Sequence, residues 1–109
     1  MELAQPHLLF LGDLRGWHRE GGTLPVIPNA SYMDVTDLSA DELDRVKPDI
    51  ILCPLFTARF DAVLIASLLH AMQFKGSLRA MSRPLPEPSI IAAEVASAAP
   101  SIDFDLFFF

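Results

Sequence analysis

Compact apolar runs along this chain alternate with segments in which apolar residues recur at helical spacing. Residues 50–53 (Ile-Ile-Leu-Cys), set between Pro48 and Pro54, lack the apolar and polar alternation of a half-exposed strand. This pattern is typical of a parallel strand that is covered on both faces, and its length favours a strand over a helix. Residues 7–11 (His-Leu-Leu-Phe-Leu) have the same character. We therefore expect two central strands that lie side by side.

Three further strands are expected, at 31–35, 77–82 and 102–108. In the first of these, Tyr32 and Asp34 alternate with Met33 and Val35, which predicts a strand with one wetter face, suited to a sheet edge. In the last, one face is expected to carry Ile102, Phe104, Leu106 and Phe108, and the other Asp103, Asp105 and Phe107.

Three helices are expected between these strands. Ser39 and Glu42 have the spacing of a reciprocal capping box, and Pro48 ends the helix that they begin. The second helix lies within 57–75, with a cap at Thr57 or Asp61 and a stop at Gly76. Its apolar stripe is assigned to Val63, Leu64, Leu68, Ala71 and Met72. Pro88 opens the third helix, which ends at Pro100.

Residues 15–30 do not fit this pattern. They hold Gly16, Gly21, Gly22, Pro25 and Pro28, which together disfavour a helix. We expect a long irregular crossover where an α/β protein normally places a helix. Loops of this length tend to be functional or mobile in compact domains.

The alternation of strands and helices predicts a single α/β domain over residues 1–109. Its five-stranded parallel sheet should have the flavodoxin-like, Rossmann-like order 2-1-3-4-5. Right-handed crossovers then place the three helices mostly on one face. The other face is expected to lack a first crossover helix, which the 15–30 loop would replace, and a final helix, because the sequence ends at Phe109.

This imbalance between the two faces predicts association. Leaving a large aliphatic and aromatic surface in water forgoes about 25 cal/mol per Å². We expect a homodimer, or docking onto a protein partner, through the uncovered face or through the terminal edge. The expected interface residues are Trp17, Leu24, Val26, Ile27, Phe107, Phe108 and Phe109. The alternative is that the 15–30 loop shields the face as a lid.

Charge and composition exclude several classes of partner. The net charge of −6 disfavours nucleic acid, since Lys and Arg supply the affinity for phosphate backbones. The longest apolar stretch, 62–72, is broken by Ser67 and His70 and is shorter than the about 20 residues of a membrane span. The first six residues lack a secretory signal pattern, and one cysteine cannot form an internal disulfide. We expect a soluble cytoplasmic protein without a membrane partner.

A ligand site, if present, should lie at the carboxyl ends of the strands, where ligands of open α/β sheets bind. The candidate residues there are Asp13, Arg15, Trp17, His18, Thr57, Arg59, Ser82 and Arg83. The arginines of this rim could hold a small anion such as phosphate or a carboxylate. No glycine-rich phosphate-binding motif is present, so no cofactor is expected.

Other reactive residues are expected to have structural roles. Cys53, the only thiol, is expected to pack in the core and not to act as a nucleophile. The three histidines have no metal-ligand spacing, so we expect no metal. Asp103 and Asp105 are expected to mark an exposed edge strand, where charge discourages further pairing.

The segment from Lys47 to Leu55, a helix that opens near Phe60-Asp61 and a strand that ends at Ser82 together resemble a response-regulator receiver domain. That family carries its phosphate-accepting aspartate where this chain has Pro54, and an acidic pair where this chain has Gly12-Asp13. The family's lysine after the fifth strand has no counterpart here. Because aspartyl phosphorylation requires the carboxylate nucleophile, the resemblance implies a degenerate receiver-like domain without phosphorylation chemistry.

The sequence thus predicts a non-catalytic regulatory or protein-interaction module that associates with itself. The alternative is a domain that binds a small anion or a nucleotide, with or without enzymatic activity, at the rim of the first and third strands. No catalytic motif distinguishes the two.

Overall fold

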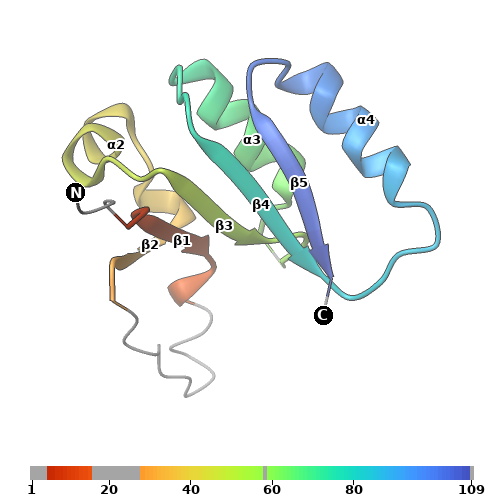
Figure 1. Ribbon diagram of the computed structural model, residues 1–109, viewed down its shortest axis with the longest axis horizontal. Coiled ribbons are helices and arrows are strands. Elements are labelled where there is room, and N and C mark those ends of the chain that lie inside the picture. Colours follow the sequence, from red (N-terminus) through yellow and green to blue (C-terminus); the bar gives the residue numbers. More distant parts are fainter. Residues whose placement is uncertain (1–4, 16–27, 58, 109) are drawn as a thin grey trace.

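A five-stranded parallel sheet runs through the part of the chain that the computed structural model describes, residues 5–15, 28–57 and 59–108 (Figure 1). Its strands are β1 (Leu8–Gly12), β2 (Ala30–Asp34), β3 (Ile50–Pro54), β4 (Ser77–Ser82) and β5 (Asp103–Phe108). The helices of the described residues are α2 (Ala40–Val46), α3 (Ala62–Ala71) and α4 (Pro88–Ala98), with a 3-10 turn, η1 (Val35–Asp37), after β2. The strand order is β2-β1-β3-β4-β5, which confirms the predicted order. Every adjacent pair is parallel.

The hydrophobic core lies on one face of this sheet. The strand residues that are buried in it are Leu9, Leu11, Met33, Ile51, Cys53, Leu78 and Ala80. They share a cluster with Leu43 of α2, Ile65 and Leu69 of α3 and Val95 of α4, so the three helices pack on the same side. Figure 1 shows α3 passing behind β4 and β5.

The opposite face of the sheet is less buried than the apolar runs predict. Leu9 and Ile51 are buried, whereas their strand neighbours Leu8 and Ile50 remain half-buried on the other face. The interpretation of the central strands as buried on both faces is therefore wrong for the face away from the helices, which the sequence also predicts to lack helical cover. Right-handed crossovers after β2, β3 and β4 place the three helices on the same side of the sheet, so the other side receives none of them.

The helix boundaries differ from the predicted ones in α3. Asp61 is the cap, because its carboxylate accepts the Leu64 N–H at 2.9 Å, and the helix ends at Ala71, well before Gly76. Its buried residues are Ala62, Ile65, Ala66 and Leu69, and not the predicted stripe, of which Leu64 is exposed. A helix that is apolar on most sides has no unique stripe in its sequence, so contact with the sheet selects the buried one.

One of the two hydrogen bonds of the predicted capping box of α2 is confirmed. The Ser39 hydroxyl accepts the Glu42 N–H at 3.1 Å, as a capping box requires. The Glu42 carboxylate, however, is bound by Arg45 at 2.5 Å. The second, reciprocal half of the box is thus replaced by an ion pair along the helix.

The predicted irregular crossover lies mostly outside the described residues. Arg15, at its start, is helical together with Leu14. Asn29, just before β2, has a φ of 59°. No helix of the described residues is both long enough and apolar enough to cross a membrane.

Candidate functional site

Asp34, the last residue of β2, is buried at the carboxyl end of the sheet. Only 4% of it is exposed, although the alternation in the sequence suggested a wetter position. Its Oδ1 accepts hydrogen bonds from the Thr36 backbone N–H at 3.0 Å and from the Thr36 hydroxyl at 2.7 Å. Its Oδ2 accepts the Arg15 backbone N–H at 3.0 Å. One carboxylate thus holds both the turn after β2 and the helical turn after β1.

Arg59 completes this cluster from the segment between β3 and α3. Its Nη2 lies 2.8 Å from Oδ2 of Asp34 and 2.5 Å from Oδ1 of Asp13, the residue that follows β1. Three segments of the chain that are far apart in sequence are therefore joined by one guanidinium group. Parallel strands make this possible because their carboxyl ends meet at the same edge of the sheet.

The hydrogen bonds decide the charge of Asp34. Burial alone would raise its pKa, but the N–H groups of Arg15 and Thr36, the Thr36 hydroxyl and Arg59 together hold the pKa well below its usual range. The hydrogen bond to Asp13 is the main cause that raises the pKa of the Arg59 guanidinium, and Asp34 adds to it. Asp34 and Arg59 are therefore both charged at neutral pH.

This arrangement argues against an anion site. Two carboxylates and one guanidinium leave one net negative charge in the cluster formed by Asp13, Asp34 and Arg59. Arg15 is engaged in the same way, since its Nη2 lies 3.3 Å from Oδ1 of Asp37. An arriving phosphate would have to displace carboxylates from both guanidinium groups.

The arrangement also argues against a dinucleotide. In dinucleotide-binding folds an acidic residue about 20 positions after the first turn accepts hydrogen bonds from a ribose. Asp34 occupies that position, but its two oxygens already accept five hydrogen-bond contacts from Arg15, Thr36 and Arg59. A carboxylate offers about four lone-pair sites, so little capacity remains for a ligand.

The predicted rim residues are only partly brought together. Asp13, Arg15 and Arg59 meet around Asp34, as described above. The Thr57 hydroxyl donates to the Phe60 carbonyl at 3.1 Å and accepts the Arg59 N–H at 3.3 Å, so it shapes the segment that carries Arg59. Ser82 ends β4 and donates to the Arg83 carbonyl at 2.8 Å. Trp17 and His18 lie outside the described residues.

Sequence reasoning missed Asp34, which is the centre of the cluster. The signal available was the position of an acidic residue at the end of a strand and two residues before a threonine, a pattern typical of a side chain that accepts local backbone N–H groups. What the sequence could not show is that Arg59 would reach the same carboxylate.

No activated nucleophile is apparent among the described residues at the carboxyl ends of the strands. Cys53 is fully buried, and burial raises the pKa of its thiol to about 12, so the thiolate is scarce at neutral pH. Pro54 ends β3 where the receiver resemblance would place the phosphate acceptor. Ser31 contacts His7 Nε2 at 3.0 Å, but at the amino-terminal end of β1, away from the rim. The described residues contain no group of three acidic, histidine or cysteine side chains that could hold a metal.

Exposed apolar side chains lie at the end of β5. Phe107 is 50% exposed and Phe108 is 46% exposed. The strand register places Phe107 opposite Met81 on the face away from the helices, whereas Phe108 contributes with Pro88 to a hollow between β5 and α4. The other predicted interface residues, Trp17, Leu24, Val26, Ile27 and Phe109, lie outside the described residues.

Fold and site together define an α/β protein of flavodoxin-like strand order whose rim is closed by its own ion pairs. No protein-family model and no curated protein matches the sequence.

Proposed function

We propose that this domain acts without catalysis, by associating with protein, and that it forms a homodimer. The resemblance to receiver domains fits a regulatory role of this kind without phosphorylation. The observation that carries the proposal is the sheet face opposite the helices. Leu8 and Phe10 of β1, with Ile50 and Leu52 of β3, stay only half-buried there although they belong to the central strands.

The position of Phe107 supports the same proposal. It lies on this face at the carboxyl end of β5 and leaves half of its surface exposed. Aromatic side chains of this kind dominate the energetics of protein interfaces when a partner buries them. A partner that covered Phe107, Met81 and the central strands would bury apolar surface beside the Arg79–Asp103 ion pair.

The small-anion alternative is less well supported. Two of its three predicted arginines, Arg15 and Arg59, are held by Asp37 and by Asp13 and Asp34, and the cluster of Asp13, Asp34 and Arg59 is net negative. We expect inorganic phosphate and nucleotides to leave the unfolding temperature unchanged. A clear rise in that temperature would favour the alternative.

Sedimentation velocity over a wide range of concentrations tests the proposal. We expect the wild type to dimerise and Phe107→Asp to dimerise more weakly, because a charge would replace an apolar contact. Ile90→Asp is the matched control, since Ile90 is 52% exposed but lies on α4, on the helical side. A wild type that stays monomeric at every concentration would exclude the proposal, and equal loss in both variants would exclude this face.

A further inference from the structure

β2 is one of the two edge strands of the sheet, and part of its backbone points away from the sheet. The Leu8 N–H donates to the Asn29 carbonyl at 2.8 Å, so that carbonyl points toward β1. A trans peptide directs its C=O and N–H to opposite sides, which turns the Ala30 N–H away from β1. Alternation along the strand places the N–H and C=O of Tyr32 on the same outer side.

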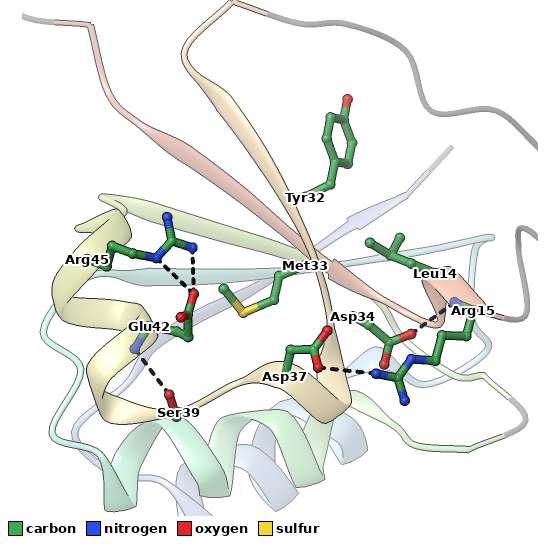
Figure 2. Close-up of a pocket in the computed structure, with 9 residues that line it drawn as sticks. All are labelled: Leu14, Arg15, Tyr32, Met33, Asp34, Asp37, Ser39, Glu42 and Arg45. Carbon is green, nitrogen blue, oxygen red and sulfur yellow. Dashed lines mark hydrogen bonds and ion pairs between the residues drawn. The ribbon is translucent and has the colours of Figure 1, made fainter.

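A groove runs beside this outer edge. Its volume is about 710 Å³, and its walls are formed by Leu14, Arg15, Tyr32, Met33, Asp34, Asp37, Ser39, Glu42 and Arg45. Figure 2 shows Met33 and Tyr32 projecting to opposite sides of β2, with Glu42 and Arg45 on α2 along one wall. The groove therefore borders the carboxyl-terminal part of the strand, Tyr32 to Asp34, between α2 and the helical turn of Leu14 and Arg15.

The other edge strand, β5, is protected against further pairing. Asp103 and Asp105 are exposed on it, and the Asp105 carboxylate already accepts the Leu106 N–H at 2.8 Å. Charges on an edge are a common device against strand addition. β2 has no such device, because residues 30–33 are uncharged and Asp34 is buried under Arg59.

The charges that flank the β2 edge are self-complementary. Arg45 and Glu42 form an ion pair on α2, and these side chains are 67% and 37% exposed. Arg15 and Asp37 form a second pair at the other end of the groove. A two-fold axis brings the same patch of two copies together, so each base can face the partner's acid. A groove with a single sign of charge would repel its copy.

We infer that the β2 edge binds a second copy of this chain by antiparallel strand addition. With the two-fold axis at Ser31, the outer backbone groups of Ala30 face those of Tyr32 in the partner, and the two sheets become continuous. The axis also brings the two α2 helices side by side, with Glu42 opposite the partner's Arg45. The face opposite the helices stays open in this dimer and doubles in width.

This inference goes beyond the proposed function, because the β2 edge is a second surface for self-association. It is separate from the Phe107 surface, which lies on the opposite edge strand. Loss of the dimer in Phe107→Asp alone would place the interface at that surface and overturn the inference while leaving the proposed function intact.

Charge exchange on α2 tests the inference. We expect Arg45→Glu to raise the dimer Kd about tenfold, since two attractive contacts become repulsive. Adding Glu42→Arg to that variant restores opposite charges across the axis, so the double variant should dimerise like the wild type. The single variants Arg45→Glu and Glu42→Arg, when mixed, should form a heterodimer, because their charges are opposite across the axis. A dimer that is indifferent to Arg45→Glu would overturn the inference.

Cross-linking gives a second test with an internal control. Residues directly opposite each other on the axis of an antiparallel pair lie within reach of a disulfide. Ser31→Cys should therefore yield a covalent dimer under mild oxidation, and Cys53 is too buried to contribute. Ser97→Cys, at an exposed site on α4, should remain uncross-linked. Equal cross-linking of both variants, or slow hydrogen exchange of the Ala30 and Tyr32 amides in a monomer, would contradict strand addition.

Discussion

Arg59 Nη2 lies 2.8 Å from Asp34 Oδ2, so a residue after the third strand neutralises the buried carboxylate that ends the second. Asp13, after the first strand, binds the same guanidinium. The three connections at this end of the sheet are thereby tied to one another. The cluster occupies the place where a ligand of such a fold would sit, and it gives that place a structural role.

We predict that Arg59→Met lowers the free energy of unfolding by about 1–3 kcal/mol, because the Asp34 carboxylate remains buried without its ionic partner. The methionine keeps most of the apolar stem. Arg45→Met serves as the comparison, since its partner Glu42 is at the surface and exposed ion pairs contribute little to stability. Urea denaturation of both variants measures the difference, and equal effects would contradict the role of Arg59 in neutralising the buried Asp34 carboxylate.

Acidification should lower the free energy of unfolding through protonation of Asp34. Its folded-state pKa is depressed, so its contribution to stability is fully present above the unfolded-state pKa of about 3.9 and is lost as pH falls toward the folded-state value. We expect Asp34→Asn to be less stable than the wild type at pH 7 and to lose less stability below about pH 4. The two curves of unfolding free energy against pH should converge in acid. Parallel curves would contradict the depressed pKa.

Tyr32→Phe should leave stability unchanged or raise it by about 1 kcal/mol. The Tyr32 hydroxyl is buried and has no hydrogen-bond partner within the described residues, so removing it loses no bond there. The ring stacks on Phe10 with centroids 5.0 Å apart, and phenylalanine keeps that contact. Tyr32→Ala should cost about 1–3 kcal/mol, because it removes the stack. A Tyr32→Phe variant that is as unstable as Tyr32→Ala would show that the hydroxyl has a partner.

The Cys53 thiol should be inert in the folded protein. It lies in β3 in the hydrophobic core on the helix-covered face, and its pKa of about 12 leaves little thiolate at pH 8. We expect an aromatic disulfide reagent to modify it only as fast as the chain unfolds, and at once in denaturant. A thiol introduced by Ser97→Cys at the exposed surface of α4 should react in the native state. Rapid modification of both thiols would show that β3 opens without global unfolding.

Much of the architecture is written in the local pattern of the chain. Uninterrupted apolar runs mark β1 and β3, a proline stops α2, and the alternation of strands with helices indicates a parallel sheet. These features depend on neighbours in the sequence, so they can be predicted from it. The handedness of the crossovers predicts that one face of the sheet receives the helices and the other does not.

Tertiary structure decides which apolar side of α3 is buried and which charged residues meet at the strand ends. Val63 and Leu64 are as apolar as Ile65 and Ala66, yet only the latter two are fully buried, because the sheet contacts one side of α3. Asp34 could have faced water until Arg59, 25 positions further along the chain, reached it across the strand ends. A sequence records such residues separately, and only the convergence of parallel strands at one edge brings their charges within bonding distance.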